Sequence, residues 1–411
     1  MNRWWRLAFA VVAMIMIANL QYGWTLFVEP LRAATHWKLS DIQWGFTLFI
    51  AFETWMMPCS GWLIDRVGPR VFLSFAGLLC GAGWAWLGRA ATLEQLYVFY
   101  SIAGFGAALV YCGCTGIGLK WFPDRRGLAA GLIAAGFGSG SALFVPVIAN
   151  ILHKQDYRAA FLDTGIVQGL LIIVAAQFLQ NPPRAAALPA SRSTVRAHTE
   201  NFNSLEMLGT PHFWMLFAMA LMMGIGGLMV TAQVGPMART LKFSAVLTLV
   251  ATLNPLTNGG GRLFWGWVSD SIGRERTMII AFLLHAGVLL SVATIGHASP
   301  LLFIVTIALV FFTWGEVYSL MPSASADFFG AKNASSNYAF IYAAKGVASI
   351  MGGGLAAKLF EKTGSWDYGF YACAVLALIS SVLAVILRRM PLPVKEAAPA
   401  AVPSSAKAIG S

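Results

Sequence analysis

The sequence has few charged residues, and acidic residues are the scarcer kind. Of 411 residues, 11% are charged, with 17 Asp and Glu against 28 Lys and Arg. A typical soluble domain has about 25% charged residues, so this chain cannot cover a soluble surface. This excludes soluble enzymes and secreted disulfide-rich domains. The net charge of +11 does not indicate a nucleic-acid partner, because the basic residues form no stripe interleaved with aromatics.

Motifs for metals and cofactors are missing as well. The five cysteines lie in apolar runs, and Cys112 and Cys114 have no His or acidic residue beside them. Buried small residues are therefore the better interpretation than metal ligands. There is no HExxH or Walker motif, and the run FGSGS (137–141) lacks the Lys-Ser/Thr ending of a phosphate loop. The longest polar segment between apolar runs is 182–211, so a membrane enzyme or a receptor with a soluble domain is disfavoured. We expect no enzyme activity, cofactor or metal.

What the chain has in abundance is hydrophobic residues, 58% of the total. They occur in runs of about 20 residues, the length that crosses a bilayer as a helix. The runs predict an all-α membrane protein with twelve transmembrane helices: 7–31, 42–64, 71–90, 95–120, 126–151, 159–181, 212–238, 244–269, 277–296, 301–326, 334–358 and 367–388.

Basic residues between these runs predict the orientation. If the N-terminus lies inside, the inner segments hold 17 Lys and Arg and the outer segments nine. The positive-inside rule then places both termini in the cytoplasm, in a multi-pass protein of the inner (cytoplasmic) membrane. The first apolar run is too long for a signal peptide and lacks a small-residue cleavage site, so it reads as the first transmembrane helix.

The two halves of the sequence repeat each other. GWLIDRVGPR (61–70) and GWVSDSIGRER (266–276) stand 205 positions apart, and WFPDRRG (121–127) and DFFGAKN (327–333) about 206. A duplicated unit is indicated. We expect two pseudo-symmetric six-helix halves, 1–182 and 212–390, a cytoplasmic linker at 183–211 and a disordered tail at 391–411. Such halves are typical of secondary transporters, with the substrate site near the midplane.

The pattern G-x-x-x-D-R-x-G at 61–68, weaker at 266–273, resembles the loop signature of the major facilitator superfamily. The resemblance covers about residues 3–390. It implies the fold of that superfamily and a functional monomer. It also places two pairs of helices at the seam between the halves, 126–151 with 244–269 and 42–64 with 334–358. The charges of the two motifs are either a topology signal or a cytoplasmic latch that breaks when the transporter changes face. The latch residues would be Asp65, Arg66, Arg70, Asp270 and Arg274.

Two basic residues lie inside the expected helices. Counted at 1.5 Å per residue, Arg262 is about 12 Å and Lys345 about 20 Å from the cytoplasmic end, against a half-thickness of about 15 Å. Charges at this depth are costly and indicate function by default. Substrate binding in a central cavity is the favoured interpretation, and structural ion pairing is the alternative.

Acidic residues reach the same depth, Glu53 at about 18 Å and Glu316 at about 16 Å. They either pair with the cations or titrate, which would couple transport to charge or protons. His285, at about 14 Å, is another candidate proton site, although a packing histidine is the favoured interpretation.

Polar and aromatic residues are expected at the same depth and would form a small box, the walls of a binding site with Arg262 and Lys345 at its two ends. Arginine offers a planar fork for a carboxylate and lysine a point charge, so the box suits a compact carboxylate anion, although any one aromatic is more often packing than binding. The residues are Gln21, Tyr22, Tyr111, Trp314 and Tyr318.

Five segments resemble the bacterial oxalate–formate antiporter family: QYGWTLF (21–27), WFPDRRGLAAG (121–131), NGGGRLFWGWVSD (258–270), FFTWGEVYSLMPS (311–323) and YAAKGVASIMGGG (342–354). The resemblance implies that Arg262 and Lys345 bind the dicarboxylate. It implies an aromatic wall of Tyr22, Trp314 and Tyr318, with Tyr111 and Gln21 nearby. Glu53 and Glu316 depart from the family pattern, in which these positions are uncharged.

The expected function is oxalate:formate exchange by alternating access. Unpaired cations would prevent the empty carrier from closing, because burying an ion without a partner costs several kcal/mol. If Glu53 or Glu316 pairs with a cation or titrates, a proton-coupled monocarboxylate symporter of the lactate/pyruvate type is the alternative. The expected partners are oxalate, formate or related small carboxylates and the lipid bilayer.

Overall fold

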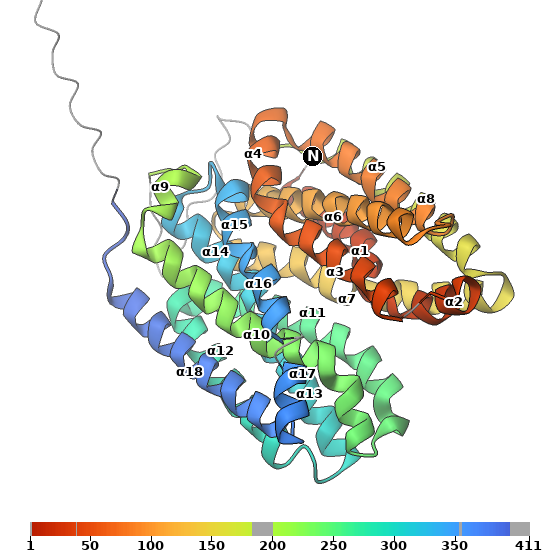
Figure 1. Cartoon of the computed structure of the whole chain (residues 1–411). Coiled ribbons are helices and arrows are strands. Elements are labelled where there is room, and N and C mark those ends of the chain that lie inside the picture. The colour runs from red at the N-terminus through yellow and green to blue at the C-terminus, as the bar shows by residue number, and fades with distance from the viewer. Residues whose placement is uncertain (1, 38, 183–199, 353–355, 395–411) are drawn as a thin grey trace, which may run out of the picture.

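The computed structural model describes residues 2–37, 39–182, 200–352 and 356–394, and every regular element in these ranges is a helix. The chain forms two groups of helices that lie side by side (Figure 1). The first group comprises α1 (Arg3–Tyr22), α2 (Thr25–Thr35), α3 (Leu39–Trp55), α4 (Met57–Val67), α5 (Pro69–Leu87), α6 (Leu93–Trp121), α7 (Arg126–Lys154) and α8 (Tyr157–Gln177).

The second group begins with the short α9 (Ser204–Leu208), which precedes the long helices. It continues with α10 (Pro211–Thr240), the 3-10 turn η1 (Ser244–Val246), α11 (Leu247–Ile272), α12 (Arg274–Thr294), α13 (Pro300–Trp314), α14 (Val317–Phe329), α15 (Ala334–Tyr342), α16 (Ala344–Ile350), α17 (Ala356–Thr363) and α18 (Asp367–Arg389).

Nine helical segments of the described chain are long and apolar enough to cross a membrane. They coincide with nine of the twelve expected spans. The other three expected spans, 42–64, 244–269 and 334–358, are also helical, as α3 with α4, α11, and α15 with α16. Each of these three carries a buried charge: Glu53, Arg262 or Lys345. The count of twelve therefore stays a prediction, while the all-α membrane fold holds.

Four expected helices are interrupted, which corrects their predicted continuity. The span 7–31 breaks at Gly23 and Trp24, 42–64 at Met56, 301–326 at Gly315 and Glu316, and 334–358 at Ala343. Glycine and the proline that opens α4 disfavour an unbroken helix. Each break lies within a few residues of a candidate site residue: Gln21, Glu53, Glu316 or Lys345. Discontinuous helices are the usual frame of a transporter's substrate site.

The internal repeat is visible in the backbone. Gly68 joins α4 to α5 with φ 85° and ψ 156°, and Gly273 joins α11 to α12 with φ 94° and ψ 157°. These dihedrals are open to glycine and strained for other residues. The two turns are 205 positions apart, so both copies of the motif build the same corner.

The linker's final residues lie on the turn between α14 and α15. Phe202 donates its N–H to the Phe329 carbonyl at 2.9 Å, and Asn333 donates to the Phe202 carbonyl at 2.9 Å. Asn203 and Glu206 form a capping box at the start of α9. The linker residues 183–199 and the tail residues 395–411 lie outside the described residues.

Helices α7 and α11 form the main contact between the halves, and glycine lets them approach closely. A Cβ on Gly266 would overlap the carbonyl oxygen of Gly127, and a Cβ on Gly138 would lie 3.2 Å from the Cα of Gly259. Small residues at membrane helix crossings allow backbone contact of this kind.

We expect Gly266→Ala to separate α7 from α11 and to lower both the melting temperature and the transport rate. The matched control is Gly260→Ala on the same helix, where an added Cβ meets nothing within 4 Å. Because alanine favours a helix by about 1 kcal/mol over glycine, the control should be neutral or stabilising. Thermal unfolding in detergent measures both variants, and an equal effect of the two would contradict the close-packing account.

Candidate functional site

Arg262 lies on α11, the helix that packs against α7 between the two halves, and 1% of its surface is exposed. Its Nε donates to the Asn258 side-chain oxygen at 2.8 Å, and Nη1 donates to the Ala134 carbonyl of α7 at 2.9 Å. Asn258 is itself held by donating to the Phe311 carbonyl at 3.0 Å. The guanidinium carbon lies 4.1 Å from the centre of the Tyr318 ring, a cation–π contact. The arginine is thus fixed by both halves.

Lys345 lies on α16, just after the break that follows α15, and is 7% exposed. Its ammonium contacts both carboxylate oxygens of Glu53, at 3.0 and 3.2 Å. It also donates to the Tyr342 hydroxyl at 3.0 Å and to the Gln21 side-chain oxygen at 3.3 Å. The Tyr342 hydroxyl donates in turn to Glu53 at 3.1 Å. Helices of both halves therefore meet in one buried polar cluster.

Aromatic rings connect the two cations. The Phe137 ring of α7 lies 5.8 Å from the Arg262 guanidinium carbon and 5.6 Å from the Lys345 ammonium. Tyr22 and Tyr111 pack against Phe137, with ring centres 5.6 and 5.4 Å away. The remaining ring contacts continue the wall: Tyr111 with Tyr342, Tyr342 with Tyr318, and Tyr318 with Trp314.

A small cavity adjoins Lys345 between the second-half helices. Its volume is about 20 Å³, which is room for about one water molecule. This cavity is therefore too small for a ligand much larger than water. The lining residues are Ala220, Gly224, Val317, Tyr318, Met321, Tyr338, Ile341, Tyr342 and Lys345.

Two further polar residues lie near this level. Glu316 stands at the junction of α13 and α14 and is fully buried, and its two carboxylate oxygens have no hydrogen-bond partner among the described residues. His285 shares a 2.8 Å hydrogen bond between Nδ1 and the Thr313 hydroxyl. The Thr313 hydroxyl donates to the Leu309 carbonyl, so the Nδ1–H of His285 is the donor. This arrangement is that of a packing histidine on α12.

The structure thus brings together eight side chains that the sequence suggested: Arg262, Lys345, Glu53, Gln21, Tyr22, Tyr111, Tyr318 and, one ring further out, Trp314. Sequence reasoning missed Asn258 and Phe137. Asn258 precedes Arg262 by four residues, one turn on the same face, and that spacing was the available signal. Phe137 lies in the glycine-rich run 136–140, where nothing distinguishes it from a lipid-facing residue.

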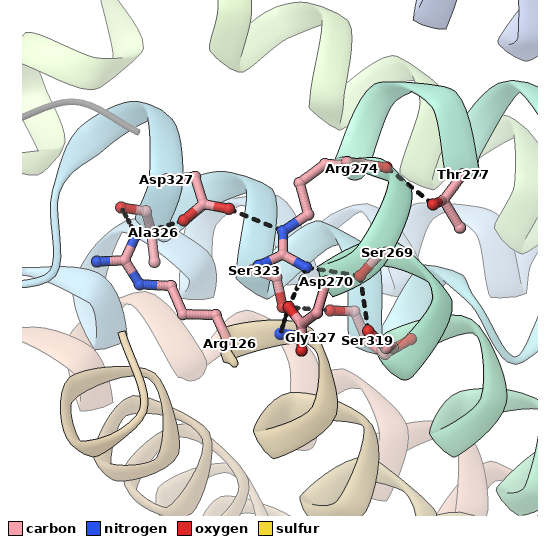
Figure 2. Close-up of polar contacts among 12 residues, drawn as sticks. Arg126, Gly127, Ser269, Asp270, Arg274, Thr277, Ser319, Ser323, Ala326 and Asp327 are labelled. Carbon is pink, nitrogen blue, oxygen red and sulfur yellow. Dashed lines mark hydrogen bonds and ion pairs between the residues drawn. The ribbon is translucent and has the colours of Figure 1, made fainter. Parts of the chain in front are cut away.

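A second charged cluster lies toward the end of the molecule at which α1 begins and α18 ends. The Asp327 carboxylate of α14 lies between the guanidinium groups of Arg126, from the first half, and Arg274, from the second (Figure 2). Arg274 Nη1 donates to Asp270 at 2.6 Å. Asp270 also accepts the backbone N–H groups of Gly127 and Leu128 at 2.9 and 2.8 Å. A carboxylate of one half therefore caps the N-terminus of α7 in the other, where the helix dipole favours an anion.

The predicted latch is only partly represented in this cluster. Asp270 and Arg274 lie in it, joined by Arg126 and Asp327, which the sequence did not single out. Arg66 and Arg70 are exposed, and the side chain of Asp65 lies outside the described residues. In the first half, Arg3 pairs with Asp124 at 2.6 Å and fastens α1 to the turn between α6 and α7.

Two groups of membrane-length helices, with buried cations at their seam and broken helices beside them, define a secondary transporter. The family model described as the Major Facilitator Superfamily matches residues 7–323 and 222–409. The chain belongs to this superfamily and, within it, to the oxalate–formate antiporter family, as the relatives show.

The oxalate:formate antiporter of Oxalobacter formigenes is 39% identical over 397 residues, covering 96% of this chain and 94% of the relative. An uncharacterized MFS-type transporter of Escherichia coli, YhjX, is 27% identical and covers 85% and 86%. Monocarboxylate transporter 13 of Rattus norvegicus is 23% identical and covers 92% and 87%. Among solved structures, the proton:xylose symporter XylE superposes with a TM-score of 0.76 at 14% identity over 93% and 95% of the chains, which supports the fold.

Proposed function

We propose that this protein exchanges small carboxylate anions, oxalate against formate, across the membrane by alternating access. The observation that carries the proposal is Arg262, which is buried at the seam and positioned by Asn258 and the Ala134 carbonyl. No acidic side chain of the described chain pairs with it. The similarity to the oxalate:formate antiporter of Oxalobacter formigenes supports the choice of anions.

The chemistry of the cluster suits these anions. The guanidinium fork of Arg262 binds a carboxylate through two parallel N–H groups, and the Lys345 ammonium provides a point charge for a second carboxylate. The rings of Phe137, Tyr111 and Tyr318 wall the site closely, which favours small, planar anions. Formate has one carboxylate to offer and oxalate has two.

Alternating access follows from the seam that the two halves share. Arg126, Asp327 and Arg274 form ion pairs that join the two halves at the end where α1 begins and α18 ends, and we infer that this end is closed. Closing the opposite end as well would bury Arg262 without a counter-ion, at a cost of several kcal/mol. A bound carboxylate removes that cost, so the loaded carrier changes face and the empty one does not. Each anion carried one way is therefore exchanged for an anion carried back.

The 17-to-nine distribution of basic residues supports an inner-membrane protein with both termini in the cytoplasm. The Arg126–Asp327 cluster is then a cytoplasmic latch, and the protein works as a monomer and has no enzymatic role.

The second candidate is a proton-coupled monocarboxylate symporter. The observation that favours it is the ion pair between Glu53 and Lys345, because a neutralised lysine lowers the cost of closing the empty carrier. Monocarboxylate transporters also occur among the more distant relatives.

Uptake of labelled oxalate into reconstituted vesicles separates the two candidates. Exchange predicts uptake into vesicles loaded with formate or oxalate and none into empty vesicles. Symport predicts uptake of lactate or formate into empty vesicles under an inward proton gradient, and that result would overturn the exchange proposal. Unlabelled oxalate, formate, lactate and malonate, added outside as competitors, define the anion range.

A further inference from the structure

The two buried cations of the site are electrostatically different. Lys345 has a carboxylate partner, Glu53, at 3.0 Å, and Glu53 is fully buried. Arg262 is held by a side-chain amide, a backbone carbonyl and aromatic rings, with no carboxylate in the described part of the chain. The Glu316 carboxylate pairs with neither cation among the described residues. Arg262, Lys345 and Glu53 together carry a net charge of +1, and this charge resides on Arg262.

All three N–H groups of the Lys345 ammonium have acceptors within the protein. An ammonium has three N–H groups, and four acceptor atoms surround this one: two oxygens of Glu53, the Gln21 oxygen and the Tyr342 oxygen. A ligand carboxylate reaches Lys345 only if one of these leaves. Gln21 and Tyr342 are neutral, so their departure would place two carboxylates at one ammonium. Protonation of Glu53 avoids that repulsion.

We propose that Glu53 is a built-in counter-ion that makes the site specific for one net negative charge, so that oxalate is carried together with one proton. Formate binds Arg262 while Glu53 stays ionised on Lys345. Oxalate binds both cations after Glu53 has accepted a proton from the aqueous side to which the site is open. This inference rests on the proposed exchange of carboxylates.

The charges of the exchange cycle then balance. Oxalate with its two negative charges and one proton on Glu53 moves one net negative charge in one direction. Formate moves one negative charge in the other, with Glu53 deprotonated. The exchange is electroneutral and is driven by a pH gradient, not by the membrane potential.

Among the described residues around the ion pair, Glu53 is the group that suits this role. The other charged groups near it are Lys345 and Arg262, and phenol hydroxyls carry no charge at neutral pH. The tyrosines facing Glu53 from α1, α6, α14 and α15 are Tyr22, Tyr100, Tyr111, Tyr318 and Tyr342.

The test is oxalate uptake into formate-loaded vesicles under an imposed potential or pH gradient. One charge in a potential of 100 mV is worth about 2.3 kcal/mol, so an electrogenic exchange changes oxalate accumulation about tenfold per 60 mV. The wild type should show no response to potential and about a tenfold increase per unit of outside acidification. Glu53→Gln should change oxalate accumulation about tenfold per 60 mV of potential and should show no response to outside acidification. Glu316→Gln, which removes a carboxyl that touches neither cation, should respond as the wild type does.

A second measurement needs no variant. When oxalate is added to the purified wild-type protein in weakly buffered solution, the protein should take up about one proton per oxalate bound. When formate is added, the protein should take up none. Electrogenic wild-type exchange, an unchanged response in Glu53→Gln, or oxalate binding without proton uptake would each overturn the inference. Wild-type vesicles that show no formate-dependent oxalate uptake would instead overturn the proposed function itself.

Discussion

Arg262→Ala is expected to reduce oxalate uptake by about two orders of magnitude. Truncating a buried, hydrogen-bonded charge that meets an opposite charge costs about 2–5 kcal/mol, and each 1.4 kcal/mol is a factor of ten. The loss should appear in oxalate binding and in exchange alike, because in the proposed cycle the guanidinium contacts the anion in every loaded state. Initial rates of labelled oxalate uptake into formate-loaded vesicles measure it.

Two controls separate binding from folding. Arg262→Lys keeps the charge but loses the planar fork and the bond to Asn258, so it should recover only part of the activity. Gly260→Ala, two residues away and in open space, should transport as the wild type does. Uptake by a folded Arg262→Ala protein at the wild-type rate would refute the assignment of Arg262.

Arg126→Ala is expected to open the end of the molecule at which α1 begins and α18 ends. Arg126 is the first-half side chain of the cluster around Asp327, and its loss removes a buried ion pair between the halves while Arg274 still neutralises Asp327. A shift of about 1.4 kcal/mol in the equilibrium between closed and open forms changes their ratio tenfold. Both forms are needed for turnover, so exchange should slow as well.

Cys112 reports this opening without an engineered probe. Its thiol is 1% exposed and lies 3.6 Å from the Ser335 carbonyl, between α6 of one half and α15 of the other. Maleimide labelling of Cys112, followed by mass spectrometry, should become about tenfold faster in Arg126→Ala. Arg3→Ala is the matched control, because the Arg3–Asp124 pair lies within one half. Equal acceleration in both variants would mean that the Arg126 cluster does not hold the halves together.

The class of protein could be predicted from composition alone, since long apolar runs permit few alternatives to membrane helices. The breaks within these helices could not be predicted from the sequence. Glycine and proline also occur in unbroken helices here, as Pro146 in α7 and Gly259 in α11 show. A break depends on which neighbours replace the lost backbone hydrogen bonds, and those neighbours come from the tertiary structure.

The residues of the site that could be predicted from the sequence are those of a type that is rare inside membrane helices. Arg262 and Lys345 stood out because a charge at membrane depth is costly. Phe137 is one of 28 phenylalanines, and a phenylalanine in a membrane helix is not unusual. Depth counting placed Glu53 and Glu316 at the level of the two cations, yet only the fold shows that Glu53 pairs with Lys345 and that Glu316 pairs with neither. Arg126 and Asp327 were missed because they lie 201 residues apart and meet only through the packing of α7 against α14.

Equilibrium binding of labelled oxalate to the purified protein, with formate as competitor, tests the central claim most directly. Exchange by alternating access through one cluster around Arg262 and Lys345 requires that both anions use the same site. The account predicts one saturable oxalate site per chain, from which formate displaces oxalate competitively. Absence of saturable oxalate binding, or simultaneous binding of oxalate and formate, would contradict it.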